Sequence, residues 1–288
     1  MDVKLPTTKK VKLTLHAAGY CKHPEWVTIR GGGRGAIRIP ALFACIEHPD
    51  AGILLWDTGY ASRFLTETDK LPARLYRMTT PVVFRAEESA ARQLTARGIA
   101  PEQVNGIIVS HFHADHIAGL KDFPNARFYY EAEAYEKVRH LRGISAVRRA
   151  FLPGLLPADF LERSQAIDPR KKVKLPEAYP FSDAADVLGD GSLLAVPLPG
   201  HADGQIGLLL STEESDHLLC ADAAWSSAAI RGNRPPHLLA GLIMADRKAY
   251  ADSLDRLVRL QRRMPDLRII PSHCPEIWEK DVQGGEGS

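Results

Sequence analysis

Short apolar runs bounded by turn residues recur along the whole chain. Runs of this length between glycine, proline and charged residues are typical of buried β-strands. We therefore expect strands at residues 11–17, 41–48, 52–57, 106–110, 126–130, 193–198, 206–212, 217–222 and 267–272.

Between these strands, other stretches place apolar residues at helical spacing. They cover residues 86–98, 131–143 and 246–263. The first two end at a glycine and the third ends shortly before Pro265, which are the expected stops of a helix. Strands and helices mixed in this way, with hairpins early in the chain, favour an α/β sandwich over an all-β barrel.

The chain has 288 residues, of which 45% are hydrophobic, and this is enough for a sizeable core. Because α/β architectures often reach this length as one unit, we expect a single domain over residues 1–288. Residues 144–185 are rich in proline, arginine and lysine and have weak periodicity, which predicts an insertion or cap over the core. We expect a flexible tail at about residues 283–288.

The charges nearly balance, with 37 lysines and arginines against 35 aspartates and glutamates. This balance gives no reason to expect nucleic acid or a membrane surface as a partner, and the basic stretches 139–149 and 170–174 are interpreted as a solvated helix face and a loop. The four cysteines form no CxxC pair, and no apolar run approaches the roughly 20 residues of a membrane helix. We expect a reduced, soluble, cytoplasmic protein.

Candidate chemistry is concentrated in residues 110–119, "SHFHADHIAG", directly after a predicted strand. His111 and His113 lie two positions apart on an extended segment, so both can face one cation. Asp115 and His116 follow at the start of the next helix and point to a neighbouring position. A single histidine behind a strand is usually structural, but four metal-binding side chains within six positions are hard to explain in that way.

Further metal-binding side chains follow other predicted strands. Asp57, His201, Asp222 and His273 each lie at or just beyond the carboxyl end of an apolar run. In open α/β sheets this edge is where ligands bind, so these residues can join the cluster at 111–116. Imidazole and carboxylate together suit Zn²⁺, and also Fe, Co or Mn. A carboxylate such as Asp222 can bridge two metals roughly 3.5–4 Å apart.

These residues resemble the motifs of one family. "HFHADH" (111–116) matches the HxHxDH signature of the metallo-β-lactamase superfamily, and "PGHADG" (199–204), "CAD" (220–222) and "SH" (272–273) are similar to its later ligand motifs, in the same order. "LLWDTG" (54–59) resembles its early DTG element. The resemblance spans about residues 11–280 and is greatest to the N-acyl-homoserine lactonase branch. The resemblance to this branch includes "HAAGYCKHPE" (16–25) and an oxygen ligand at Asp222.

The resemblance implies an αββα sandwich with two divalent metal ions, zinc above all, at one edge of two packed sheets. The first ion would be held by His111, His113 and His201, and the second by Asp115, His116 and His273. Asp222 would bridge the two ions, and Asp57 would support the site without ligating. Members of this branch are often dimeric, which makes a homodimer an expectation from resemblance alone.

Particular residues separate the branches of the superfamily. His113 stands where di-iron oxygen-reducing members carry a glutamate, which disfavours that redox branch. Asp222 stands where true β-lactamases commonly use cysteine, and Cys220 would share a strand face with it as a weak rival ligand. One departure concerns Trp225, because lactonases of this branch typically have a tyrosine there. An indole N–H donates a hydrogen bond but exchanges no proton near neutral pH.

The resemblance predicts hydrolysis of a small-molecule lactone or ester, most of all an N-acyl-homoserine lactone, which would make the protein a quorum-quenching enzyme. A metal-bridging hydroxide would attack the carbonyl, and Asp115 or Asp222 would return the proton to the leaving alkoxide. Candidate substrate-binding residues are Tyr20, Cys21 and Trp225. Residues 60–84 and 225–243 would suit an acyl chain, but equally a dimer interface or ordinary core, and ordinary packing is favoured for most of their side chains.

Two alternatives stay open. The same metal site could serve another lactone, an aryl ester or a phosphodiester. A metal-binding sensor or regulatory protein with little turnover is the other alternative, although a purely structural zinc site would normally have four protein ligands on one ion.

Overall fold

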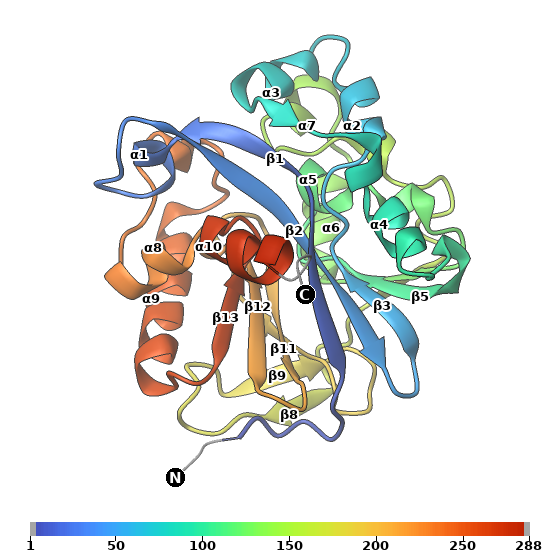
Figure 1. Ribbon diagram of the computed structural model, residues 1–288, viewed down its shortest axis with the longest axis vertical. Helices are drawn as coiled ribbons and strands as arrows, with labels where there is room; N and C mark the ends of the chain where they lie inside the picture. Colours follow the sequence, from blue (N-terminus) through green and yellow to red (C-terminus); the bar gives the residue numbers. More distant parts are fainter. Residues whose placement is uncertain (1–3, 285–288) are drawn as a thin grey trace.

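The computed structural model describes residues 4–284 and contains two β-sheets packed face to face, with helices on both outer sides (Figure 1). The first sheet has the strand order β4-β1-β2-β3-β5-β6-β7 and the second has the order β13-β12-β11-β10-β9-β8. The first-sheet strands are β1 (Lys12–Pro24), β2 (Ala36–His48), β3 (Gly52–Trp56), β4 (Val82–Val83), β5 (Val104–Ile108), β6 (Arg127–Tyr130) and β7 (Ser164–Ala166). The second-sheet strands are β8 (Lys172–Lys174), β9 (Asp183–Asp186), β10 (Leu194–Pro197), β11 (Ile206–Ser211), β12 (Asp216–Ala221) and β13 (Arg268–Pro271).

An apolar layer joins the two sheets. It contains Leu54, Trp56 and Ile108 from the first sheet, packed against Leu208 and Leu219 from the second, all buried. Two further apolar clusters lie between each sheet and its own outer helices. This arrangement of helix, sheet, sheet and helix confirms the predicted αββα sandwich.

The helices follow the chain as short segments, apart from one long helix. They are α1 (Glu25–Thr28), α2 (Ser62–Glu67), α3 (Arg74–Thr79), α4 (Ala90–Ala96), α5 (Ala114–Ile117), α6 (Ala132–Val138), α7 (Gly143–Val147), α8 (Ser227–Gly232), α9 (Arg247–Arg263) and α10 (Pro275–Ile277), with a π-helical turn η6 (Trp278–Gln283) after α10. The side chain of Asp246 caps α9 by accepting from the backbone N–H groups of Lys248 and Ala249. Leu254 and Leu257 of α9 are buried against the second sheet.

The predicted strands agree with observed ones, but the early hairpin is longer than its apolar pattern. β1 and β2 pair antiparallel from Lys12 to Pro24, with an irregularity between Ala17 and Tyr20. Gly19 lies in this irregularity with a φ of 75°, a backbone conformation that glycine adopts without strain. The part of β1 beyond the irregularity carries polar residues, so the apolar run that predicted the strand ended at residue 17.

The segment 144–185, predicted as an insertion or cap, contains β7 and β8 and most of β9. β7 extends the first sheet beside β6, and β8 pairs with β9 at the edge of the second. The segment therefore carries the chain from one sheet to the other, and its closing over the site stays a prediction. Of the predicted tail, residues 285–288 lie outside the described residues. In the described part, residues 4–284, no helix is both long and apolar enough to cross a membrane.

Candidate metal centre

Strands from both sheets deliver the predicted side chains to one edge of the sandwich. β3 and β5 are parallel neighbours in the first sheet, and β12 and β13 are parallel neighbours in the second. Their carboxyl ends therefore lie together, as do the residues that follow them. These residues are Asp57 after β3, His111 after β5, His201 after β10, Asp222 after β12 and His273 after β13.

Three overlapping groups of three side chains form at this edge, and one of them, His111, His116 and Asp222, connects the other two. His111, His113 and His201 each place one ring nitrogen within 4.8 Å of the others. Asp115, His116 and His273 do the same with a carboxylate oxygen and two ring nitrogens. The His113 Nδ1 and His201 Nε2 atoms lie 2.9 Å apart. Both groups offer the nitrogen and oxygen donors that suit a divalent metal ion.

Asp222 lies between the two groups and is almost completely buried. Its Oδ2 is 3.1 Å from His201 Nε2 and 3.0 Å from His273 Nε2, and its Oδ1 is 3.3 Å from His116 Nε2. One carboxylate thus faces a histidine of the first group and two of the second, as a bridging ligand would.

Asp57 orients two of the histidines without joining either group. Its Oδ1 accepts from the backbone N–H of Ser110 at 2.8 Å, and its Oδ2 accepts from Ser110 Oγ at 2.7 Å and from His116 Nδ1 at 2.8 Å. Because Ser110 Oγ donates to Asp57, its lone pair accepts from His111 Nδ1 at 3.0 Å. In both His111 and His116 the proton is therefore on Nδ1, and Nε2 is left with a free lone pair.

His273 is oriented in the same way by the backbone of β2. Its Nδ1 donates to the carbonyl of Pro40 at 2.7 Å, so Nε2 is the ring atom that faces the two aspartates. The backbone also ties the two sheets together here, because Leu42 N–H donates to the carbonyl of Ser272 at 2.9 Å. The long β2 strand is therefore part of the site.

Buried polar atoms without hydrogen-bond partners are a second indication that these residues fit a metal centre. In the described residues, several buried polar atoms at this edge have no hydrogen-bond partner. They are His111 Nε2, His116 Nε2, His201 Nδ1 and Asp222 Oδ1. Buried polar atoms without partners are costly in a folded protein. Metal coordination would satisfy Nε2 of His111 and His116, the ring atoms that remain when Nδ1 is used as the donor.

The electrostatics of the cluster divide the histidines into two kinds. Burial lowers the pKa of His111 and of His113 well below the ordinary value, and neighbouring histidines lower it further. Both therefore stay neutral, which is the form that ligates a metal. Burial also disfavours the charged form of His273, but Asp222 and Asp115 outweigh it and raise the pKa of His273 to about 9. The carboxylates thus create a strongly cation-favouring position beside the second group.

Two non-glycine residues next to the site have a left-handed backbone. Asp57 has a φ of 56° and Ala221 has a φ of 48°. Such conformations cost energy and persist where the surroundings enforce them. At Ala221 this breaks the alternation of β12, so Cys220 packs in the helix-side core while Asp222 turns to the histidines. The expectation that Cys220 shares a face with Asp222 is therefore wrong.

The predicted substrate-binding residues lie at different distances from the cluster. Trp225 packs edge-on against His201, with ring centroids 5.8 Å apart, and lines a cavity of about 420 Å³ together with His273. Its Nε1 is buried and has no partner among the described residues. Cys21 is buried, and burial together with Asp115 raises the pKa of its thiol. Tyr20 packs on Trp278 at 5.6 Å, on the side of the C-terminal turn.

A further group of potential ligands, His48, Asp50 and Asp190, already contains a cation. Lys9 Nζ lies 2.6 Å from Asp50 Oδ2 and 2.7 Å from Asp190 Oδ2. His48 Nδ1 accepts backbone N–H groups of Asp50 and Ala51. This group is therefore an ion-pair and hydrogen-bond cluster in which the ammonium occupies the place of a metal.

Sequence reasoning missed three contributors to the centre. Ser110 connects Asp57 to His111, and its position directly before the histidine motif was an available signal. Thr58 Oγ1 donates to the carbonyl of His116 and accepts from Gly119 N–H, which docks α5 on the loop after β3. The carbonyl of Pro40 had no signal, because any residue type supplies that atom.

Comparisons with known proteins agree with this geometry. The family model described as the metallo-beta-lactamase superfamily matches residues 45–273. A probable metallo-hydrolase of Mycobacterium tuberculosis is 29% identical over 241 residues, which cover 80% of this chain and 73% of that protein. The N-acyl homoserine lactonase AttM of Agrobacterium fabrum is 28% identical over 251 residues, covering 85% of this chain and 86% of that one.

A solved structure supports the same fold. An N-acyl homoserine lactone hydrolase, with the product N-hexanoyl-L-homoserine bound at its catalytic metal centre, superposes with a TM-score of 0.66. The two sequences are 20% identical, and the match covers 97% of both chains.

Proposed function

This chain belongs to the metallo-β-lactamase superfamily and is a metal-dependent hydrolase, and from that premise we propose that it opens lactones, with N-acyl-homoserine lactones as its substrate class. The observation that carries the proposal is the position of Asp222, which lies 3.0–3.3 Å from Nε2 atoms of His116, His201 and His273. The lactonase relative AttM, at 28% identity, supports the choice of substrate class.

The proposed centre holds two divalent ions. His111, His113 and His201 would bind one, Asp115, His116 and His273 the other, and Asp222 would contact both. The mixed imidazole and carboxylate donors suit Zn²⁺, and Fe, Co and Mn are chemically compatible. When bound, such ions lower the pKa of a coordinated water and polarise a carbonyl oxygen.

The protein's own groups would prepare this chemistry. Asp57 and the Pro40 carbonyl keep Nδ1 of His116 and His273 protonated, so that both rings present Nε2 to the centre. Asp115 is our candidate for the acid that protonates the leaving alkoxide. Its side chain is 13% exposed, whereas that of Asp222 is 3% exposed, so Asp115 is the carboxylate that can exchange protons with solvent.

Trp225 supports a second candidate substrate. It stands where the lactonase branch typically has a tyrosine, and its Nε1 is buried without a partner. If this N–H donates to the substrate carbonyl, an acyl-homoserine lactone remains suitable. If it only forms the wall of the cavity beside His273, other lactones or aryl esters become the better candidates.

Proton release tests the proposal, because lactone opening produces an acid. The protein is loaded with Zn²⁺ or Co²⁺ and mixed in weak buffer with acyl-homoserine lactones, other lactones and aryl esters, with the His111→Ala variant as the blank. We expect metal-dependent acid release with the acyl-homoserine lactones. Release with only the other substrates would reassign the substrate class. A metal-loaded protein that retains an unaltered lactone without turnover would instead be a sensor.

A cytoplasmic location and a homodimer complete the proposal. The four cysteines are free and buried, as expected in a reducing compartment. Opening of acyl-homoserine lactones inside the cell would interrupt quorum signalling. Light scattering of the purified protein tests the dimer.

A further inference from the structure

The end of the molecule formed by α3 and α7 exposes large apolar side chains. We call residues 69–80 and 136–150 the cap surface. Leu71 is 70% exposed, Leu75 40%, Met78 67% and Ile144 54%. Leu75 and Met78 are three positions apart and share one face of α3, and Leu71 lies in the turn directly before this helix.

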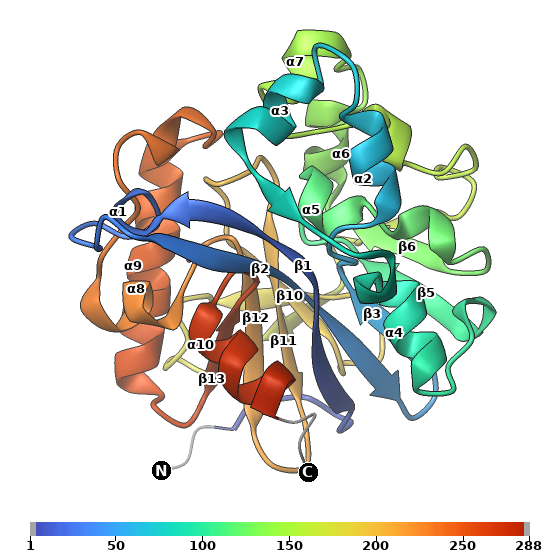
Figure 2. The ribbon, with the colours of Figure 1, turned by 45° about the horizontal axis from the view of Figure 1, so that its top comes forward.

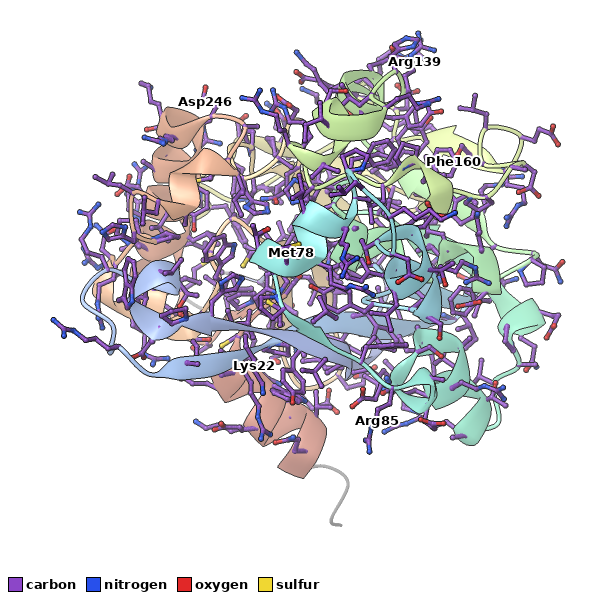
Figure 3. The ribbon with its side chains drawn as sticks, turned by 90° about the horizontal axis from the view of Figure 1, so that it is seen from above. Lys22, Met78, Arg85, Arg139, Phe160 and Asp246 are labelled. Atoms are coloured by element: carbon purple, nitrogen blue, oxygen red, sulfur yellow. The ribbon has the colours of Figure 1, made fainter. Side chains whose placement is uncertain are left out.

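The two parts of the cap surface are neighbours in space. α3 and α7 lie side by side at the top of the molecule in both ribbon views (Figures 1 and 2). A Cβ built on Gly143, the first residue of α7, would lie 4.0 Å from Cγ of Pro72. Figure 3 looks down on this end and shows Met78 near the middle of the face and Arg139 towards its edge.

The exposed apolar side chains are not needed for packing of the core. The opposite side of α3 is anchored by Tyr76, whose ring packs edge-on against the buried Phe64 at 5.5 Å. Leu71, Leu75 and Met78 therefore point outward while the helix is already held from below. Contiguous exposed apolar side chains of this kind mark interaction surfaces.

The cap surface also concentrates positive charge. Eight cations and two carboxylates give it a formal charge of +6, while the whole chain has +2, so the remainder has −4. The cations are Lys70, Arg74, Arg77, Lys137, Arg139, Arg142, Arg148 and Arg149, and the carboxylates are Asp69 and Glu136. The near balance of charge over the whole chain gave no reason to expect a charged surface as a partner, because the net charge sums the positive cap surface and the negative remainder.

Half of these cations have no ionic partner. Within residues 4–284, no carboxylate lies within 4.0 Å of the charged groups of Lys70, Arg74, Arg142 and Arg148, in contrast to Arg77, which pairs with Asp69 at 3.1 Å. Unpaired cations beside exposed aliphatic side chains are the combination that binds the surface of an anionic bilayer. The aliphatic groups enter the interfacial region, and the cations attract the lipid headgroups.

We propose that the cap surface docks the protein onto anionic lipid bilayers. A second copy of the chain is disfavoured as the occupant, because a two-fold contact would place +6 against +6. Nucleic acid is disfavoured because the protruding side chains are aliphatic and cannot stack on bases. The surface adjoins the metal centre, since Val138 and Arg149 line a small cavity together with His113 and His201. Docking would therefore bring the centre close to the lipid surface.

Vesicle co-sedimentation of the full-length protein tests the proposal. Phosphatidylcholine vesicles with and without phosphatidylglycerol are compared at low and high salt. We expect binding to the anionic vesicles only, and loss of binding as salt increases. Replacing Arg74 and Arg148 together by glutamine should weaken binding by roughly 30-fold, at roughly five-fold for each cation near such a surface.

The apolar contribution is tested with Leu71→Asp and Met78→Asp, each expected to weaken binding by roughly ten-fold or more. The matched control is Leu161→Asp, which changes a side chain that is 60% exposed outside the cap surface and should leave binding unchanged. Equal unfolding temperatures for the three variants exclude a folding defect. The proposal is overturned by absence of vesicle binding, by equal binding to neutral vesicles, or by sensitivity to the arginines alone, which would indicate a general polyanion site. Dimerisation that depends on Leu71 and Met78 would overturn it in favour of a second copy.

Discussion

Replacing Asp57 by asparagine should weaken one metal-binding group and leave the other nearly intact. The Asp57 carboxylate accepts three hydrogen bonds, from the N–H and Oγ of Ser110 and from Nδ1 of His116. An amide has one acceptor oxygen and one donor group. If the oxygen keeps the Ser110 N–H bond, the amide N–H₂ faces His116 Nδ1, which must then accept. The His116 proton moves to Nε2, the atom that faces Asp222 at 3.3 Å.

The size of the effect follows from this change of tautomer. Loss of a carboxylate that orients a ligating histidine typically costs about 10- to 100-fold in metal affinity, or about 1.4–2.7 kcal/mol. Only the group of Asp115, His116 and His273 should be affected. In addition, a buried donor left without a partner should cost about 1–3 kcal/mol of folding stability.

Competition with a colorimetric chelator measures both metal affinities. We expect two similar binding steps in the wild-type protein and a 10- to 100-fold gap between them in Asp57→Asn. Asp252→Asn is the control, because Asp252 is 57% exposed in a surface pair with Lys248. Wild-type affinity for both ions in Asp57→Asn, with only the stability lowered, would refute the reasoning and leave Asp57 a structural role alone.

Three other predictions concern single residues. Gly200→Ala should destabilise the fold by about 2–4 kcal/mol in thermal unfolding, because Gly200 has a φ of 124° and a Cβ there would clash with the backbone nitrogen of Tyr250. Gly35→Ala is the control, because a Cβ on Gly35 meets nothing within 4 Å and should leave stability unchanged. Burial lowers the pKa of His16 from 6.5 to about 4, so only the unfolded chain binds this proton between these values. The free energy of unfolding should therefore be highest above pH 6.5, where His16 is neutral in both states, and should fall by about 3 kcal/mol on acidification to pH 4. Denaturant titrations should not show this loss in His16→Phe. Trp225→Phe should lower kcat/KM on the order of 10²-fold if the indole N–H donates to the substrate, and an unchanged value would make Trp225 only a wall of the cavity.

The fold class could be predicted from the sequence, and so could the convergence of the side chains of the centre at one edge of the sandwich. Strand ends and motif spacing are local signals, and they placed His111, His113, Asp115 and His116 after one strand and His201, Asp222 and His273 after others. Their convergence needs only parallel strands with carboxyl ends at one edge. Their roles as ligands remain predictions.

Features that depend on tertiary structure could not be predicted. The bond from His273 to the Pro40 carbonyl comes from a backbone atom, which has no sequence signal. The direction of Asp222 depends on the positive φ of Ala221, because alternation along the strand would place Asp222 on the same face as Cys220. The short strands β7 and β8 contain polar and charged residues because they lie at sheet edges, so no apolar run marked them.

The exposed apolar side chains of α3 illustrate a different limit. The mixture of apolar and loop residues in 60–84 suits substrate binding, a dimer interface or ordinary core packing equally. Met78 is apolar but 67% exposed, whereas Phe64, in the same segment, is completely buried. Composition cannot separate these cases, since burial depends on what packs against each face.

Metal titration of the metal-free protein, followed by lactone turnover, tests the central claim most directly. Zn²⁺ is added in known amounts, and both the bound metal and the rate of acid release from an acyl-homoserine lactone are measured. The account predicts no turnover without metal and a rate that rises until two ions are bound per chain. Turnover by the metal-free protein, or a full rate with one ion bound, would contradict the two-metal centre formed by Asp222 and the six side chains around it.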